Sequence, residues 1–407
     1  MDSRRIACMD CGAPARWGVM GRCVACAGIL QPDYDDARIA QLPSIQAGRG
    51  IDRYRALMPV ESAPLPYLGE GDTPLLRAEH LGEALGLSHL FLKNEGLNPS
   101  GAFKDRAGAM VAALAVEAGA SGVVSASSGN ASSAIAAYCA AARLKCVILM
   151  EAGNPPAKLR QTLATGAQVL LVEGIFAHGP QALAACLTEV ALRTNYYLGF
   201  VWAPINPYAL EGIKTIAYEV VARLGAAPDV VVTPVGGGDM FVAQWRGYKE
   251  LKRAGMIAKL PRMVAVQSFS APPLVAAVEQ GLHRVATLPD AKSRVSGINV
   301  AFTGDHALAA VHQSGGTAIG ITDEAAFAMQ RRLALEEGIW VEPAGAAPVA
   351  ALANLRERGL VLADERVVCV MSGAGFKDAS LASEEALSIG QQPTIPFDVE
   401  AISRHLR

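Results

Sequence analysis

Residues 123–150, VVSASSGNASSAIAAYCAAARLKCVILM, give the clearest indication of the fold class. This segment opens with a short apolar run (123–126), passes through Ser-Ser-Gly-Asn (127–130) and enters an Ala-rich stretch (131–143) of helical composition. It closes with a second apolar run (146–150). A strand, a helix and another strand in succession are typical of a parallel sheet covered by helices. The sequence therefore predicts an α/β protein.

The same alternation continues on both sides of this stretch. The apolar runs predict buried strands, because strands of parallel sheets are covered on both faces. We expect further strands at 168–172, 229–235, 263–268 and 366–372, and helices at 107–116, 158–166, 180–193 and 239–254.

Composition excludes several classes of protein. The chain has 407 residues, 36 Lys+Arg against 38 Asp+Glu, 18% charged and 51% apolar residues. That length suggests two or three domains, and the apolar content argues against disorder. The balance of charge argues against a nucleic-acid binder. Neither a secretion signal nor an apolar run of ~18 residues is present, so we expect a cytoplasmic enzyme with no membrane partner.

Four of the eight cysteines lie in residues 1–30, which we interpret as a separate zinc-ribbon-like module. Two Cys-x-x-Cys pairs, Cys8 with Cys11 and Cys23 with Cys26, are eleven residues apart. Such pairs close a tetrahedral four-thiolate Zn²⁺ site, which has no open position and is therefore structural. Redox dithiols or plain thiols are the alternative. Residues 31–65 show no clear periodicity and are expected to form a connector.

Two segments carry chemistry before or at the start of predicted helices. The first, NPSGAFKDR (98–106), places Lys104 where a turn enters a helix, and a lysine that loses its proton there can form a Schiff base. Taken alone, such a lysine is usually a solvated surface residue. The second, Ser127-Ser128-Gly129-Asn130, offers backbone N–H groups to a carboxylate or phosphate; an ordinary N-cap is the simpler interpretation.

Two further segments follow predicted strands. Gly236, Gly237 and Gly238 in TPVGGGD (233–239) can form an anion-binding nest, although a glycine triplet is often only a flexible turn. Ser372 in MSGAGFKD (371–378) lies at a strand's carboxyl end, where open parallel sheets bind ligands. Together, the four segments suit a cofactor with a phosphate, an aldehyde and a ring nitrogen, which points to pyridoxal phosphate.

Residues 66–385 resemble the fold-type II pyridoxal-phosphate enzymes and, within them, the threonine synthases. NPSGAFKDR and SSGNAS carry the resemblance, together with NPYALEGIKT (206–215), AIGITDE (318–324) and VEPAGAA (341–347). It implies that Lys104 binds the cofactor, with Phe103 beside the ring, Asn130 at its 3′ oxygen and Ser372 at its nitrogen. It also implies that the substrate carboxylate lies at Ser127, Ser128 and Gly129, and the cofactor phosphate at Val235, Gly236, Gly237 and Gly238.

The resemblance also implies an architecture. It consists of two doubly wound three-layer α/β/α domains, similar to the tryptophan synthase β fold, in a homodimer. We expect a small substrate domain at 96–179 and a large cofactor domain at 66–95 and 180–407.

The predicted reaction converts O-phospho-L-homoserine and water to L-threonine and phosphate. Cations must then bind the substrate phosphate; Lys158, Arg160, Lys214 and Arg106 are candidates, and Lys158 and Lys214 lead because they lie in threonine-synthase-like stretches. Two features depart from that pattern: the loop reads GGGD where GNAGN is usual, and segment 293–308 does not match.

These departures keep other functions open. A serine/threonine dehydratase (ammonia-lyase) or a β-replacing enzyme is the alternative within the cofactor class. A zinc-dependent binding or regulatory protein, with a degenerate enzyme body, is the alternative from another class.

Overall fold

The computed structural model describes residues 5–18, 20–42, 48–127, 129–152, 159–288, 290–378 and 394–405. Internal contacts divide the chain into two units, Met1–Lys377 and Asp378–Arg407. We call the first unit the body. The second contains helix α16 (Val399–His405). No helix in the described ranges combines the length and apolar character needed to cross a bilayer.

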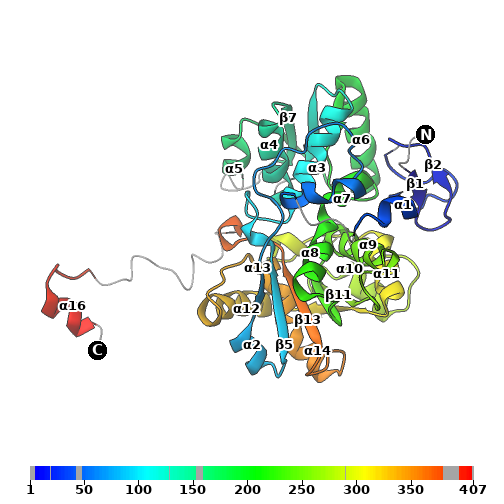
Figure 1. The fold of residues 1–407 in the computed structure, drawn as a ribbon. Helices are drawn as coiled ribbons and strands as arrows, with labels where there is room; N and C mark the ends of the chain where they lie inside the picture. The colour runs from blue at the N-terminus through cyan, green and yellow to red at the C-terminus, as the bar shows by residue number, and fades with distance from the viewer. Residues whose placement is uncertain are drawn as a thin grey trace. The chain divides into compact units, whose positions relative to one another are not determined.

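The larger sheet of the body has six strands (Figure 1). All neighbouring strands are parallel except β4 and β5, which are antiparallel, so the sheet is mixed where the sequence predicted a parallel one. In spatial order the strands are β12 (Thr317–Ile321), β11 (Arg262–Ser268), β10 (Val230–Pro234), β13 (Arg366–Met371), β5 (His89–Asn94) and β4 (Leu75–Arg77).

Helices bury both faces of this sheet, as β10 shows. Successive strand residues point to opposite faces; Val231 packs in one core cluster with Phe241, and Val232 in another with Val349. The elements of this part are α2 (Glu79–Ala84), α7 (Leu210–Ile213), α8 (Thr215–Leu224), α9 (Asp239–Arg253), α10 (Pro273–Glu279), α11 (Asp305–Ser314), α12 (Asp323–Glu336), α13 (Pro343–Ala350) and α14 (Leu352–Glu357), with short 3₁₀ turns at Glu95–Leu97, Pro207–Ala209, Ser296–Ile298 and Gly375–Asp378.

The smaller sheet has four parallel strands in the order β8-β7-β6-β9. Strand β9 pairs with β6, although we expected the small domain to end at residue 179; the sheet itself therefore reaches past that boundary. The elements are β6 (Gly122–Ala126), β7 (Lys145–Glu151), β8 (Gln168–Val172) and β9 (Tyr196–Leu198), with helices α3 (Lys104–Glu117), α4 (Asn130–Ala141), α5 (Arg160–Ala164) and α6 (Gly179–Thr194).

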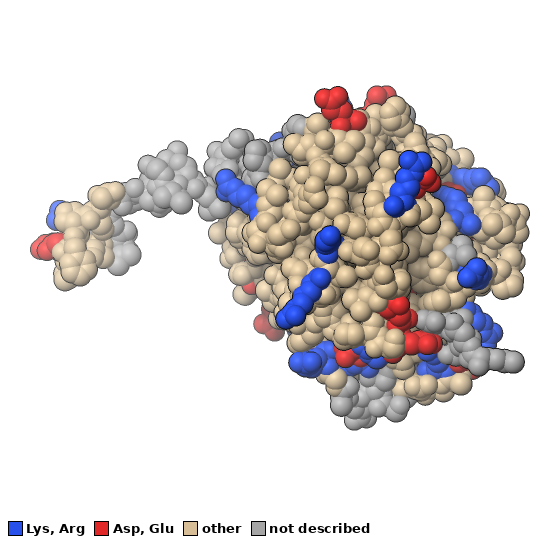
Figure 2. Space-filling model, turned by 90° about the horizontal axis from the view of Figure 1, so that it is seen from above, with Lys and Arg blue, Asp and Glu red and all other residues tan. Residues whose placement is uncertain are grey.

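The cysteine-rich start forms a third, antiparallel sheet. It joins β2 (Pro14–Ala15), β1 (Arg5–Cys8) and β3 (Leu30–Asp33), so it extends three residues beyond the predicted end at residue 30. The expected connector continues with α1 (Asp36–Ile39) and a 3₁₀ segment, η2 (Gly50–Leu57). On the face seen in Figure 2, basic and acidic side chains are scattered among neutral ones.

Candidate active site

Lys104 lies where a loop meets the start of a helix, as the sequence predicted. It is the first residue of α3, and the preceding loop lies against the end of β13, because Phe103 N donates to the carbonyl oxygen of Ser372 (3.0 Å). Burial lowers the pKa of the Lys104 amine, and the carboxylate of Asp239 opposes that shift. Nζ lies 4.8 Å from the centre of the Phe103 ring. A lysine that gives up its proton readily is a nucleophile and a base.

Glu342 brings together two predicted site residues from different sheets. Ser372 follows β13 of the larger sheet, and Asn130 begins α4 beside the smaller one. Ser372 Oγ donates to Glu342 Oε1 (2.7 Å), and Asn130 Nδ2 donates to Glu342 Oε2 (2.9 Å). Glu342 lies in VEPAGAA (341–347) and was not among the predicted site residues. The sequence did contain a clue to Glu342, because it is the single acidic residue of an apolar stretch. A carboxylate buried in such a stretch needs hydrogen-bond donors, and these would be polar residues of a site.

The glycine triplet joins β10 to α9 and leaves its amides free. Side chains satisfy its carbonyl groups: Thr303 Oγ1 donates to Gly236 O (2.7 Å) and Trp202 Nε1 to Gly237 O (3.2 Å). The N–H groups of residues 236–239 form no hydrogen bond to another described residue. Gly238 has φ +99°, and a Cβ there would lie 2.9 Å from that of Ala307. Free amides at a helix start form a binding place for an anion.

Comparisons with known proteins agree with this geometry. A family model described as "Pyridoxal-phosphate dependent enzyme" matches residues 67–373. The chain belongs to this family. It is 36% identical to the threonine synthase of Methanosarcina acetivorans over 95% of both chains. It is also 36% identical to that of Methanocaldococcus jannaschii, over 94% of this chain and 96% of the relative. Among solved structures, a threonine deaminase from T.th. superposes with a TM-score of 0.61 at 26% identity, covering 74% of this chain and 92% of that one.

The residues present fit the cofactor of a pyridoxal-phosphate dependent enzyme. Lys104 offers a buried amine to the aldehyde, and the amides of residues 236–239 offer donors to the phosphate. Ser372 and Asn130 offer polar groups to the ring and are held by one carboxylate. Val235 is buried and comes directly before the glycines, and its N–H donates to the carbonyl oxygen of Val266 (2.8 Å). Val235 therefore fixes where the glycine loop begins, and its own amide is not available to the phosphate.

The predicted carboxylate loop of this enzyme precedes α4. Gly129 is the residue before the helix, and its N–H donates to Ser127 Oγ (3.2 Å). Apart from its chain neighbours, no atom of the described residues lies within 4 Å of the position that a Cβ on Gly129 would take. The loop thus borders open space. Ser128 and Lys158 lie outside the described residues.

Lys214, which we expected to bind the substrate phosphate, lies in a buried ion-pair cluster. Its Nζ is fully buried and pairs with Glu211 Oε2 (2.8 Å) and Glu250 Oε2 (3.0 Å). It also lies 4.2 Å from the centre of the Tyr34 ring. The nearby Arg246 pairs with Glu211 as well (2.6 Å). With two carboxylates already bound, Lys214 is a structural cation that supports the contact with the N-terminal residues.

Arg106 is also structural, which corrects the second expectation of this kind. The side chain is fully buried and pairs with Glu95 (2.7 Å) and Glu219 (2.5 Å). Lys93 pairs with the same Glu219 (2.6 Å), and Thr215 Oγ1 accepts a bond from Arg106 Nη1 (2.8 Å). Two cations and two anions balance one another in this cluster, so no charge remains for a phosphate.

Lys377 is a cation that sequence reasoning missed. It follows Ser372 by five residues, and its Nζ donates to Ser133 Oγ of α4 (2.7 Å) and to Gln161 Oε1 of α5. Burial lowers its pKa, while the carboxylates of Asp105 and Glu342 oppose that shift. Arg160, the exposed neighbour of Gln161, begins α5. Lys377 could have been found from the sequence, because it lies in MSGAGFKD (371–378), the segment that supplied Ser372 as a candidate.

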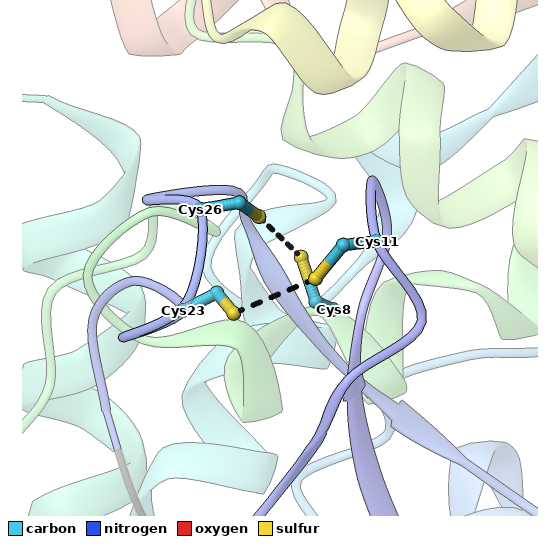
Figure 3. A group of neighbouring side chains, drawn as sticks. All are labelled: Cys8, Cys11, Cys23 and Cys26. Atoms are coloured by element: carbon cyan, nitrogen blue, oxygen red, sulfur yellow. Dashed lines mark hydrogen bonds between the residues drawn. The ribbon is translucent and has the colours of Figure 1, made fainter.

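The four predicted cysteine ligands lie together, as Figure 3 shows. All Sγ atoms are within 4.8 Å of one another, with Cys8–Cys26 at 3.5 Å and Cys11–Cys23 at 3.8 Å. Backbone N–H groups of Ala25 and Cys26 lower the pKa of Cys23 to about 7. Zn–S bonds of ~2.3 Å in a tetrahedron require S···S separations of about 3.8 Å, so the cluster has the dimensions of a four-thiolate metal site.

Proposed function

We propose that the chain is a pyridoxal-phosphate dependent carbon–oxygen lyase of the threonine synthase type. Its reaction would convert O-phospho-L-homoserine and water to L-threonine and phosphate. The observation that carries the proposal is the convergence of Lys104, the free amides of residues 236–239 and the Ser372–Glu342–Asn130 contacts. The two threonine synthases, similar over nearly the whole chain, support it.

Each group has a task in this reaction. When bound, pyridoxal phosphate withdraws electrons from the substrate Cα. Lys104 removes and returns protons at the substrate carbons, because burial favours its neutral form. The loop around Ser127 and Gly129, together with Ser128, holds the substrate carboxylate. Lys158, Arg160 and Lys377 are the cations we assign to the substrate phosphate, since Lys377 contacts the residue next to Arg160.

The decisive experiment incubates the cofactor-loaded protein with O-phospho-L-homoserine. We expect release of inorganic phosphate together with L-threonine. Lys104→Ala should abolish turnover, whereas Lys252→Ala, at an exposed position on α9, should leave it unchanged. Loaded protein that releases no phosphate, or full turnover by the Lys104 variant, contradicts the proposal.

A serine/threonine dehydratase is the second candidate, with a β-replacing enzyme beside it. The glycine triplet and the similarity to a threonine deaminase structure favour a dehydratase. Formation of a 2-oxo acid from L-threonine or L-serine, with no phosphate release from O-phospho-L-homoserine, would decide for it. Turnover of a β-substituted amino acid only in the presence of a second nucleophile would decide for β-replacement.

We also propose that Cys8, Cys11, Cys23 and Cys26 bind one structural Zn²⁺. Their spacing supports this, and four thiolates leave no position for substrate. Zinc analysis of the purified protein tests it; one metal ion per chain is expected, and its absence from folded protein contradicts it.

The remaining proposals concern organisation. We propose that the six-stranded and the four-stranded sheet each form the centre of one domain. Because β9 belongs to the four-stranded sheet, the smaller domain extends past residue 179. The family resemblance supports a cytoplasmic homodimer that acts on a small amino acid, without nucleic acid or membrane partners. Sedimentation of the loaded enzyme tests the dimer.

A further inference from the structure

Two features that depart from the threonine synthase pattern meet in the structure. One is Asp239, which follows the glycine triplet; the other is segment 293–308. This segment lies against the glycine loop, because Thr303 Oγ1 donates to Gly236 O (2.7 Å) and Gly304 N donates to Gly237 O (3.3 Å). Because the glycine loop with Asp239 and segment 293–308 are both unusual and contact each other, a change in one of them can compensate for the change in the other.

His306, from the same segment, is the buried group that this contact leaves unexplained. It is 3% exposed, and neither Nδ1 nor Nε2 has a hydrogen-bond partner among the described residues. Nε2 lies 3.7 Å from Asp239 Oδ1 and 3.5 Å from the point where a Cβ on Gly238 would stand. The imidazole thus faces the glycine loop. Buried polar atoms without partners are costly, so native proteins rarely keep them without a reason.

The charge of Asp239 supplies that reason. Its Oδ1 accepts a hydrogen bond from Ala203 N (2.8 Å), and the residue is 6% exposed. A buried carboxylate at the start of α9 repels a phosphate dianion bound to the same helix start. A protonated imidazole between these groups would turn the repulsion into attraction on both sides.

We propose that His306 is protonated when the loop at residues 236–239 is occupied, and that its imidazolium neutralises Asp239 so that the loop holds a phosphate dianion. The inference rests on the proposed binding of pyridoxal phosphate. Other charges around it are Lys104, which interacts with Asp239, and Asp305 of the same helix, whose Oδ1 accepts from Val285 N (2.8 Å). The neutral Gln267 of β11 contacts the same segment, because its Nε2 donates to Thr303 Oγ1 (3.1 Å).

The first test measures binding of inorganic phosphate and of pyridoxal phosphate to the full-length enzyme freed of cofactor. We expect His306→Gln to weaken both by about tenfold or more, which is about 1.4 kcal/mol. His312→Gln, at an exposed position on the same helix, should change neither. In the His306→Gln/Asp239→Asn double variant, phosphate binding should return to within about threefold of Asp239→Asn alone.

Three results would overturn the inference: unchanged binding by His306→Gln, an equal loss in His312→Gln, or an undiminished loss in the double variant. Unaltered enzyme that binds neither probe overturns the cofactor proposal itself. If unaltered enzyme binds both probes and His306→Gln binds them equally well, the cofactor proposal stands and the role of His306 is wrong.

A second measurement needs no variant, so it stands even where His306→Gln does not fold. At about pH 8 an ordinary histidine is neutral. Calorimetric titration with inorganic phosphate, in buffers of different ionisation enthalpy, should therefore show measurable proton uptake, close to one proton per site. Binding without proton uptake overturns the inference.

Discussion

Ser372 and Glu342 are joined by a hydrogen bond of 2.7 Å between Ser372 Oγ and Glu342 Oε1. A serine hydroxyl carries one proton, so while Glu342 accepts it, Ser372 presents only lone pairs to any other group. The second oxygen of Glu342 accepts from Asn130 Nδ2. One carboxylate therefore sets both the orientation and the donor or acceptor character of two side chains that we assign to the cofactor ring.

Replacing Glu342 by Gln tests this arrangement. The amide keeps one acceptor oxygen and replaces the other by a donor, so Ser372 or Asn130 loses its acceptor. Losing one hydrogen bond to a charged group costs about 1.5–3 kcal/mol. We expect the dissociation constant for pyridoxal phosphate to rise about tenfold or more, measured by absorbance titration. Glu336→Gln, which alters a helix-surface pair with Arg332, is the control. Equal cofactor affinity in both variants would contradict the role of Glu342.

Lys214→Met should reduce stability and spare substrate affinity. Removing this cation leaves Arg246 as the fully buried cation that interacts with both Glu211 and Glu250 in the described part of the chain. Breaking a buried ion pair costs about 3–5 kcal/mol, which urea unfolding would measure. The folded fraction should keep its KM for O-phospho-L-homoserine. A large rise in KM at unchanged stability would return Lys214 to the substrate site.

Lys377→Met should have the opposite signature. Its Nζ contacts α4 and α5, beside Arg160, where we place the substrate phosphate. We expect KM for O-phospho-L-homoserine to rise about tenfold, consistent with loss of a charge-assisted hydrogen bond. The dissociation constant for pyridoxal phosphate should stay within about twofold. Lys145→Met, at an exposed position at the start of β7, is the control. An unchanged KM would remove Lys377 from the phosphate subsite.

Asp105 predicts a pH dependence of stability. Burial raises its pKa from 3.8 to about 6, although Ser100 N donates to Oδ2 (2.6 Å). Oδ1 has no hydrogen-bond partner in the described part of the chain. The folded protein therefore holds this proton more tightly than the unfolded chain. Its contribution to stability is present below about pH 4 and is lost as pH rises through about 6.

Asp105→Asn should remove that dependence. We compare the change in unfolding free energy from about pH 4 to about pH 7 in the two proteins. This change should be about 2–3 kcal/mol more favourable in Asp105→Asn than in the unaltered protein, because only the latter loses the contribution of the Asp105 proton. Urea unfolding at the two pH values measures the difference. Asp290→Asn, at an exposed position, should show no such gain. A parallel pH dependence in Asp105→Asn and the unaltered protein would contradict the prediction.

Removal of the metal should open the N-terminal module locally. The ring centres of Trp17 and Tyr208 lie 4.9 Å apart, and Gly18 N donates to Tyr208 Oη (2.9 Å), so the module contacts the 206–215 stretch within the body. Cys11→Ser should lose zinc and shift the Trp17 emission towards that of an exposed indole, because metal binding and folding of such modules are coupled. Cys186→Ser, an exposed cysteine on α6, is the control. Retained zinc in Cys11→Ser would contradict the four-cysteine assignment.

The elements that were predicted correctly have causes that are local in the chain. Apolar runs place β8 at the predicted residues 168–172 and β11 within one residue of its prediction. The turn residues before Lys104 place it at the start of a helix. The two Cys-x-x-Cys pairs predict a cluster, because each pair is a local knuckle. By contrast, the short strands β4 and β9 were not predicted, since three residues carry too little periodicity.

Our assignment of charged residues to the site depends on contacts that form only in the folded chain. Lys214 and Lys377 both lie in stretches with a site-like pattern, yet one pairs with two buried carboxylates and the other contacts α4 and α5. Asn130 and Glu342 are 212 residues apart in the sequence, yet they are hydrogen-bonded. Asp239 and His306 are also distant in the sequence, so no local pattern predicts that they lie close together. Helices and strands follow from neighbours along the chain, whereas the charge state and partners of a buried side chain follow from whatever the folded chain brings within a few ångströms of it.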